Sequence, residues 1–337
     1  MRVAVFGSKP YDQAFLSAAN QALGEAGHDL HYFHVRLNRE TWELAKGFEA
    51  VCVFVNDELT APVLASLASH GLRFVALRCA GFNNVDLKMA DQLGISVVRV
   101  PAYSPESVAE HAVGLMLTLS RKYHRAFQRV RDGNFALQGL LGFNFHGRTA
   151  GLIGLGKIGL ATARILKGLG MRVIGFDQVF SEAAKAIGIE PVSLETLYAD
   201  SDVISLHCPL TRDTFHLINE YSLAQMRRGV MLINTSRGGL IDTAAVIAAL
   251  KSEQLGYLGL DVYEQEGDLF FEDLSDKVIA DDAFERLLTF PNVLITGHQG
   301  FFTEEALGSI AEVTLRNLVQ LGQGEACPNL LGSDYLA

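Results

Sequence analysis

The stretch TAGLIGLGKIGLATARILK, residues 149–167, decides the fold of this chain. An apolar run of strand type leads into three glycines, Gly154, Gly156 and Gly159, and these lead directly into a helical pattern. Asp177 follows Gly159 by 18 residues and closes the next strand-like run, RVIGF at 172–176. A lone G-x-G-x-x-G is weak evidence. Strand, glycine turn, helix and acidic strand end together are typical of a dinucleotide-binding βαβ unit.

Each glycine of this turn has a physical role. Gly154 permits the tight turn from strand to helix, Gly156 lets a pyrophosphate approach the backbone, and Gly159 allows close packing of helix on sheet. Lys157 and Ile158 begin the helix at its positive dipole end, where unpaired N–H groups suit an anion. The turn therefore predicts a site for the phosphates of a dinucleotide.

Asp177 indicates which dinucleotide is bound. Its carboxylate would accept hydrogen bonds from a ribose 2′-hydroxyl and repel a 2′-phosphate, and residues 178–181 contain no Arg or Lys to bind one. NAD is therefore expected rather than NADP. FAD is disfavoured because its motif usually opens a chain. The alternative is that the glycines serve only helix packing and that Asp177 is a surface cap.

Short apolar runs alternate with helical patterns on both sides of this unit, which predicts parallel α/β layers. From residue 149 onward we expect six strands of a doubly wound sheet, at 149–153, 172–176, 203–206, 230–234, 258–262 and 293–296. An earlier series of strands is expected at 2–6, 51–55, 74–77 and 97–100. Between the two series, prolines at 101 and 105 interrupt the pattern and open one helix over 105–131, expected to be the longest of the chain. A last helix of about 17 residues follows Thr303 and is expected to return to the first series.

The composition excludes several classes of protein. The chain has 337 residues, of which 49% are apolar and 20% charged, so two globular domains are expected and disorder is not. The net charge is −10 and no basic run is longer than Arg227–Arg228, so a nucleic-acid surface is not expected. The four cysteines are widely spaced and form no metal-binding pattern, which predicts a reduced, cytoplasmic protein without a metal. No secretory leader or membrane-spanning run is recognised, so a soluble protein is expected.

Three polar residues follow strands of the second series. Arg237 comes after 230–234, Glu266 after 258–262 and His298 after 293–296. Because ligands of open α/β sheets bind outside the carboxyl ends of the strands, all three are expected to face one crevice. Taken singly, Arg237 could lie in a solvated turn, Glu266 could face solvent and His298 could be a core or surface histidine. The set is more specific than its members.

These residue types suit the reduction of a 2-keto acid. Arg237 can bind a carboxylate with two parallel hydrogen bonds, and His298 can give a proton to a ketone oxygen or take one from an alcohol. A neighbouring Glu266 carboxylate would favour the protonated form of His298, which makes its imidazole more basic, and would orient the ring. A hydride from nicotinamide to C2 and a proton from His298 to the oxygen would complete the reaction.

Five ordered motifs resemble the signatures of the D-2-hydroxyacid dehydrogenases. They are G-x-G-x-x-G at 154–159, HCPLT at 207–211, NTSRGG at 234–239, LDVYEQE at 260–266 and GH at 297–298. RCAGFNNVD at 78–86 and PAYSPESVAEH at 101–111 extend the resemblance to essentially the whole chain. Within the family the chain resembles most the bacterial fermentative D-lactate dehydrogenases. Gly267 begins an insertion where many relatives have proline. After His298 the chain reads Gln-Gly-Phe-Phe at 299–302, instead of the Ile-Gly-Gly common in glycerate and hydroxypyruvate relatives.

The resemblance implies an NAD-dependent enzyme that interconverts pyruvate and D-lactate. Arg237 would bind the substrate carboxylate, His298 would donate and accept the proton, and Glu266 would orient His298. Hydroxypyruvate, glyoxylate or a larger 2-keto acid is the alternative substrate. A non-catalytic NAD-sensing corepressor is the alternative function, which the complete set of three residues disfavours.

The family resemblance also implies the organisation of the chain. Two Rossmann-like or flavodoxin-like domains with parallel sheets are expected. An NAD-binding domain over 104–299 would be inserted into a substrate domain formed by 1–103 and 300–337. Family members associate through the cofactor domain, so a homo-oligomer, dimer or tetramer, is expected.

Further binding residues follow from the same resemblance. The substrate would contact backbone N–H groups near Ala80 and Gly81, with Arg78 and Tyr103 close by. The nicotinamide half of NAD would contact Thr235, Ser236 and Asp261. The adenosine half would contact His207, Cys208, Pro209 and Thr214.

Overall fold

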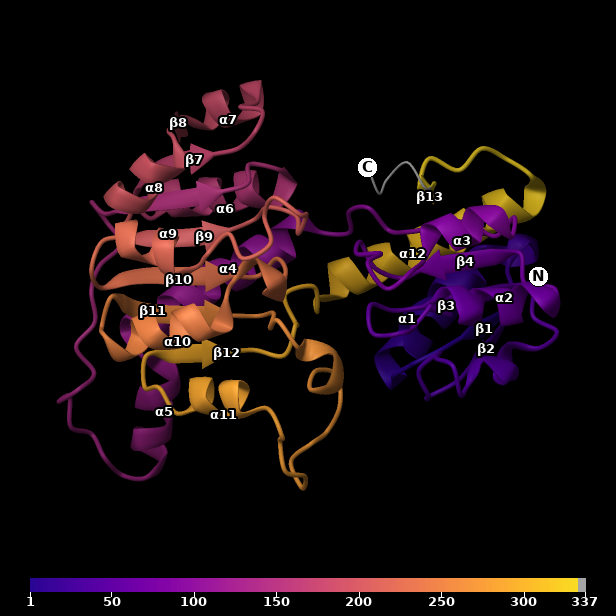
Figure 1. Ribbon diagram of the computed structural model, residues 1–337, viewed down its shortest axis with the longest axis horizontal. Helices are drawn as coiled ribbons and strands as arrows, with labels where there is room; N and C mark the ends of the chain where they lie inside the picture. The colour runs from indigo at the N-terminus through magenta and orange to yellow at the C-terminus, as the bar shows by residue number, and fades with distance from the viewer. Residues whose placement is uncertain (333–337) are drawn as a thin grey trace. The chain divides into compact units, whose positions relative to one another are not determined.

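The computed structural model describes residues 1–332, except for the side chain of Asp268. It divides into two compact units, one formed by Met1–Ser104 with the segment from Phe302 onward, the other by Pro105–Phe301. Both units are α/β layers built on sheets that are almost wholly parallel (Figure 1). The alternation of strand and helix patterns predicted this class of fold, and the prediction is confirmed.

The first unit contains a six-stranded sheet in the order β13-β5-β4-β3-β1-β2. Its strands are β1 (Arg2–Val5), β2 (Asp29–Tyr32), β3 (Ala50–Val53), β4 (Phe74–Leu77), β5 (Ser96–Val98) and β13 (Leu330–Leu331). Only β13 runs antiparallel to its neighbour. The apolar runs predicted four of these strands. They missed β2, a partly exposed edge strand, and β13, which has two residues.

Successive apolar side chains along each central strand of the first unit point to opposite faces of its sheet, so a hydrophobic core lies on each face. Val3 and Val5 of β1 face α1 (Pro10–Ala22) and α12 (Glu304–Gln323), which pack against each other. Ala4 and Phe6 face α2 (Ala61–Ser69) and α3 (Leu87–Gln92). Two short 3-10 segments, η1 (Gly24–Ala26) and η2 (Trp42–Ala45), lie between β1 and β3 in the chain. At 20 residues, α12 is longer than expected from sequence and is the longest helix in residues 1–332.

The second unit contains a seven-stranded parallel sheet in the order β12-β11-β10-β9-β6-β7-β8. Its strands are β6 (Thr149–Ile153), β7 (Arg172–Phe176), β8 (Glu190–Pro191), β9 (Val203–Leu206), β10 (Val230–Asn234), β11 (Leu255–Leu260) and β12 (Val293–Ile295). The six expected strands are all present, although β11 begins and ends earlier than its apolar run indicated. The exposed pair that forms β8 carries no apolar signal.

The helix expected over 105–131 is two helices, α4 (Pro105–Arg121) and α5 (Tyr123–Arg131). Lys122 between them has a φ of 54°, a left-handed conformation that ends the first helix. No glycine or proline marks this position, so the sequence pattern did not reveal the break. The expectation of one longest helix here was therefore wrong.

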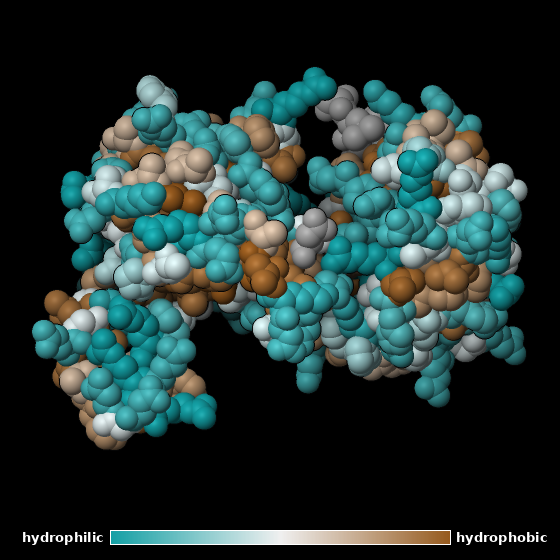
Figure 2. All heavy atoms as spheres, turned by 60° about the horizontal axis from the view of Figure 1, so that its bottom comes forward, coloured by the Kyte–Doolittle hydropathy of each residue, from teal (hydrophilic) through white to brown (hydrophobic). Residues whose placement is uncertain are grey.

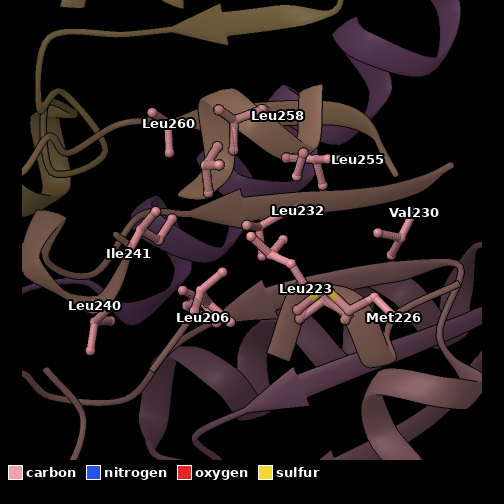
Figure 3. Close-up of a cluster of buried hydrophobic side chains, with 14 of the residues drawn as sticks. Leu206, Leu223, Met226, Val230, Leu232, Leu240, Ile241, Leu255, Leu258 and Leu260 are labelled. Carbon is pink, nitrogen blue, oxygen red and sulfur yellow. The ribbon is translucent and has the colours of Figure 1, made fainter. Parts of the chain in front are cut away.

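Helices cover both faces of the second sheet, and α4 packs on α6 (Lys157–Gly168). The other elements are α7 (Glu182–Ile187), α8 (Leu194–Asp200), α9 (Glu220–Gln225), η3 (Gly238–Leu240), α10 (Thr243–Lys251), η4 (Glu266–Asp268) and α11 (Asp282–Leu288). Figure 3 shows part of the core, where side chains of β9, β10 and β11, among them Leu206, Leu232 and Leu258, meet those of α9. Within residues 1–332, no helix is both long and apolar enough to cross a membrane.

Candidate active site

The carboxyl ends of β10, β11 and β12 lie side by side at one edge of the second sheet (Figure 1). In register, Asn234 pairs with Leu260, and Leu260 pairs with Ile295, so the three strands end at the same level. The loop after each strand carries one of the predicted reacting residues, Arg237, Glu266 or His298. The sheet therefore brings these three loops to one edge.

Glu266 and His298 form a direct pair. The distance from His298 Nδ1 to Glu266 Oε1 is 2.9 Å, and the second carboxylate oxygen accepts a hydrogen bond from the Tyr263 backbone N–H at 3.0 Å. An ionised carboxylate can only accept, so Nδ1 is the donor and Nε2 is the ring nitrogen left for another partner. The ring also packs against Phe271, with 5.6 Å between ring centroids.

The backbone of His298 is held in an uncommon conformation. Its φ is 53°, in the left-handed region that non-glycine residues rarely adopt. Its N–H donates to the Asp261 carbonyl oxygen at 2.8 Å. The buried Asp261 carboxylate accepts from the Gln299 N–H at 2.9 Å and from the Gly300 N–H at 2.8 Å, on the other side of the histidine. Asp261 thus fixes the loop that presents the imidazole ring.

His111 completes this network from helix α4. Its Nε2 lies 3.1 Å from Asp261 Oδ1 and 3.0 Å from the hydroxyl of Thr296, which itself donates to Asp261 at 2.5 Å. Burial acts to raise the pKa of the Asp261 carboxyl, but the hydrogen bonds and charge around it, those of His111 foremost, hold that pKa below its usual value. The carboxylate therefore stays ionised and acts as the anchor of the loop.

Arg237 is held by its backbone rather than by an acidic partner. The Asn234 side chain closes the turn, donating to the Arg237 carbonyl at 2.8 Å and accepting from the Ser236 N–H at 3.0 Å. The Arg237 guanidinium donates to the Ser236 carbonyl at 2.7 Å and makes no ion pair with a carboxylate of residues 1–332. Most of its donors remain available to a ligand.

Gly238 explains how the loops after β10 and β11 come close. A Cβ atom on Gly238 would lie 2.1 Å from the backbone carbonyl of Tyr263, a contact that no side chain can make. The two loops are also tied by Glu264, which lies 2.6 Å from His216 Nε2 and accepts from the Thr243 hydroxyl at 2.9 Å. Sequence reasoning did not identify these supports, and the first glycine of NTSRGG, Gly238, was the available signal for the close approach.

The glycine turn has the shape that a dinucleotide needs. Gly154 has a φ of 96°, and a Cβ there would lie 2.5 Å from the backbone of His207. A Cβ on Gly159 would lie 2.1 Å from the Gly154 carbonyl oxygen, whereas one on Gly156 would meet nothing within 4 Å. The backbone is therefore open at the position where a pyrophosphate would approach.

Three buried polar atoms just after β9 and β10 lack a hydrogen-bond partner in residues 1–332. They are both ring nitrogens of His207 and the hydroxyl of Thr235. Burial lowers the pKa of His207 to about 4, so the ring is neutral at pH 7 and can bond to a ligand as donor or acceptor. Buried polar groups are normally satisfied, so these atoms fit a site completed by a bound cofactor.

The other residues predicted to bind the cofactor lie near the carboxyl ends of β6, β7, β9 and β10. Asp177 Oδ2 accepts from the Leu155 N–H of the glycine turn at 2.6 Å, and Ser236 donates to the Leu206 carbonyl at 3.0 Å. Thr214 is tied into the turn after β9, where its hydroxyl donates to Pro209 at 2.7 Å. Burial raises the pKa of the Cys208 thiol to about 11, so this cysteine is neutral. Lys157 and Ile158 are the first residues of α6.

The first unit carries the other predicted substrate residues at the end of β4. Arg78 is buried, with its Nε 3.2 Å from Asp12 Oδ1 and its Nη2 3.2 Å from the Gly7 carbonyl. Ala80 and Gly81 follow in the next loop, where Arg99 donates to the Ala80 carbonyl at 3.0 Å. Neither of their backbone N–H groups donates a hydrogen bond to residues 1–332. Tyr103 lies just before α4 and is partly buried.

Comparison with known proteins places the chain in a family. A family profile described as "D-isomer specific 2-hydroxyacid dehydrogenase, NAD binding domain" matches residues 113–300. The D-lactate dehydrogenase of Escherichia coli strain K12 is 56% identical over 98% of this chain and 100% of its own. The apo structure of the D-lactate dehydrogenase from Escherichia coli aligns with a TM-score of 0.90 and 54% identity, over 98% of this chain and 100% of that one.

Two further solved structures show the same fold. That of the pyruvate reductase of Chlamydomonas reinhardtii has a TM-score of 0.92 at 44% identity, over 98% of both chains. That of D-lactate dehydrogenase from Aquifex aeolicus, complexed with NAD and lactic acid, has a TM-score of 0.84 at 34% identity, over 96% of both chains. With a profile match over more than half its length and a relative 56% identical, the chain belongs to the D-isomer specific 2-hydroxyacid dehydrogenases, a family of NAD-dependent enzymes.

Proposed function

We propose that this enzyme reduces pyruvate to D-lactate with NADH and catalyses the reverse reaction. The observation that carries the proposal is the pairing of His298 with Glu266 at 2.9 Å, beside the loop of an arginine that has no acidic partner in residues 1–332. Reduction of a 2-keto acid requires an acid–base group that protonates the ketone oxygen and a guanidinium that is free to bind the carboxylate. The names of the relatives support lactate as the product.

The residues divide the chemistry among them. NADH, when bound at the glycine turn, supplies the hydride that reduces C2 of the keto acid. Arg237 binds the substrate carboxylate and so fixes which carbon is presented. His298 donates the Nε2 proton to the ketone oxygen, while Glu266 holds Nδ1 and stabilises the charged ring before that transfer. In the reverse direction Nε2 accepts the proton of the hydroxyl group.

The loop after β4 carries two proposed donors for the substrate carboxylate. The backbone N–H groups of Ala80 and Gly81 are free in residues 1–332 and lie in one loop, which suits an anion. Arg78 is bound to Asp12 and Gly7, so we propose that it fixes the start of this loop and does not itself bind the substrate. Tyr103 remains a proposed substrate contact.

A panel of 2-keto acids tests the substrate. Steady-state oxidation of NADH is measured with pyruvate, hydroxypyruvate, glyoxylate and phenylpyruvate, and pyruvate is expected to give the highest kcat/KM. A kcat/KM for pyruvate that is tenfold or more below that of another acid, about 1.4 kcal/mol in transition-state binding, would exclude lactate as the assigned product. The family assignment would be unaffected.

Asp177 is proposed to select NADH over NADPH. Asp177→Asn removes the charge but keeps an oxygen that can accept from the Leu155 N–H, a bond that measures 2.6 Å in the native chain. The ratio of kcat/KM for NADH to that for NADPH is expected to fall by about tenfold or more, because repulsion of the 2′-phosphate is lost. An unchanged ratio would mean that Asp177 supports the glycine turn and does not select the cofactor.

The homo-oligomer is proposed to form through α5 and the segment after it. Large apolar side chains are exposed there, including Phe127 at 64%, Leu137 at 81% and Leu141 at 86%. Figure 2 shows brown, apolar residues on the lobe at the lower left, which contains α5. A second copy is the proposed occupant, because several large apolar side chains exposed within one short segment often mark a protein–protein interface. The four cysteines are free thiols, which supports a reducing, cytoplasmic location.

Light scattering after size-exclusion chromatography measures this association. The native chain is expected to elute as a dimer or tetramer, and the double variant Leu137→Ser, Leu141→Ser as a smaller species, because it removes apolar area from the interface. The control is Val278→Ser, which replaces an even more exposed apolar residue (95%) outside this segment. A native monomer, or equal masses for all three proteins, would contradict the proposal.

A further inference from the structure

The second unit has a cavity of about 230 Å³ at the amino ends of its strands, at the opposite end of the sheet from the predicted reacting residues. Three arginines line it, Arg148, Arg227 and Arg228, with Asp202 as the acidic side chain among them. Arg148 directly precedes β6, Asp202 directly precedes β9, and the two neighbouring arginines precede β10. All strands of this sheet run in the same direction (Figure 1), so their amino ends lie opposite their carboxyl ends. The cavity is therefore separate from the glycine turn and from the Glu266–His298 pair, which both follow carboxyl ends.

The lining of this cavity carries an excess of positive charge. Asp202 Oδ1 lies 3.3 Å from Arg148 Nη1 and 3.4 Å from Arg227 Nη1, so one carboxylate is shared by two guanidinium groups. Its other oxygen accepts from the Thr149 N–H at 2.9 Å. Arg228 lies 3.4 Å from Glu253, whose side chain is mostly exposed. This cationic cluster contrasts with the net charge of −10 for the whole chain.

The guanidinium groups have hydrogen-bond donors to spare. Each has five N–H donors, and its contacts in residues 1–332 use two of them. Arg148 Nε donates to Asn144 and Arg227 Nε to Ala199, both at 3.0 Å and in addition to Asp202. Arg228 donates to the Ser252 carbonyl and to Glu253. The unused donors suit the several oxygens of an oxyanion, which guanidinium groups bind in parallel pairs.

The turn that carries two of these arginines is rigidly built. Gly229 has a φ of 83° and donates to the Gln254 carbonyl at 2.9 Å, while the Val230 N–H donates back to Arg227 at 3.1 Å. A Cβ on Gly256 would lie 2.4 Å from the Gly229 carbonyl oxygen, so the turn is pressed against the start of β11. A site that is formed before its ligand arrives loses little entropy on binding.

Aromatic rings hold the third arginine and form one wall. The Arg148 guanidinium lies over the Phe143 ring at 4.7 Å, and Phe143 contacts Tyr257 with 5.4 Å between ring centroids. Both aromatic residues line the cavity. A guanidinium stacked on a ring keeps its edge, where the donors lie, free for an anion.

We propose that this cavity binds a phosphate group, either free phosphate or a phosphomonoester. Phosphate at neutral pH carries more charge than the carboxylate of a 2-keto acid and offers more acceptor oxygens to converging arginines. Binding there would link the starts of β6, β9 and β10, and so would stabilise the second unit without touching the reacting residues.

Isothermal titration calorimetry with inorganic phosphate tests the site. The native enzyme is titrated at constant ionic strength, with NADH saturating so that the glycine turn is occupied. Saturable binding is expected, and Arg227→Ala and Arg148→Ala are each expected to weaken it at least tenfold. Arg286→Ala is the matched control, because Arg286 is an exposed arginine stacked on Phe290 at 4.7 Å, on α11. It should bind phosphate as the native enzyme does.

Thermal unfolding provides a second measurement. Phosphate is expected to raise Tm further in the native enzyme and in Arg286→Ala than in the two cavity variants, compared at equal ionic strength. The difference between proteins matters because phosphate stabilises folded states in general, and that effect is common to all variants. A lower starting Tm of a variant leaves this comparison intact.

Three outcomes decide the proposal. No saturable binding to the native enzyme, or equal affinity in the native enzyme and both cavity variants, would overturn it. Loss in the cavity variants with retention in Arg286→Ala would support it. Phenyl phosphate then separates the two sources. Tighter binding than inorganic phosphate would assign the site to a phosphomonoester whose organic part lies on Phe143 and Tyr257, and equal binding would assign it to free phosphate.

Discussion

Replacing His298 by asparagine is expected to lower kcat for pyruvate reduction by about 10²–10⁴-fold, the usual contribution of a positioned acid–base group. Asparagine is the appropriate substitution because His298 has a φ of 53°, and asparagine tolerates this region better than most residues. Its amide can still donate hydrogen bonds but cannot supply the proton that the ketone oxygen needs. The backbone bond to Asp261 at 2.8 Å does not depend on the side chain.

The binding of NADH separates loss of chemistry from loss of structure. Because His298 lies at the end of β12 and the glycine turn follows β6, the affinity of His298→Asn for NADH is expected to match the native value. Nucleotide fluorescence measures that affinity, and stopped-flow single turnover measures the hydride step. Native-like turnover in His298→Asn would reject the role of His298 as proton donor, and lost NADH binding would show that the loop itself had failed.

Replacing Arg237 by lysine is expected to lower kcat/KM for pyruvate by roughly 30- to 1,000-fold, or about 2–4 kcal/mol, mainly by raising KM. Lysine keeps the positive charge but lacks the planar fork that binds both oxygens of a carboxylate. The native guanidinium has no acidic partner in residues 1–332 and donates only to Ser236 at 2.7 Å, so it is available to the substrate. Gly238 and the Asn234 bonds that shape the turn are unchanged by this substitution.

Methyl pyruvate identifies the interaction that is lost. This ester keeps the reacting ketone and removes the negative charge, so the native enzyme should strongly prefer pyruvate to it. Arg237→Lys should reduce that preference, because the variant loses more with the acid than with the ester. A preference equal to that of the native enzyme would mean that Arg237 acts elsewhere in the reaction. Equal NADH affinity in both proteins is the required control.

Local patterns in the sequence predicted most of the strands of the fold. Buried parallel strands are continuous apolar runs, and for this reason the sequence predicts β6, β9 and β10. The strands that were missed, β2, β8 and β13, are edge strands that are short or partly exposed and therefore lack an apolar run. The break at Lys122 was also invisible, because neither glycine nor proline marks it.

The sequence by itself determined the glycine turn and the chemical types at the strand ends. Glycine alone tolerates the φ of 96° at Gly154 and the contact at Gly159, and such constraints act within a few residues. Only the tertiary structure decided which groups pair. Asp261 anchors the histidine loop with His111, and Arg148 and Arg227 share the Asp202 carboxylate. These contacts join residues far apart in the chain, so they depend on the register and order of neighbouring strands, which no local pattern encodes.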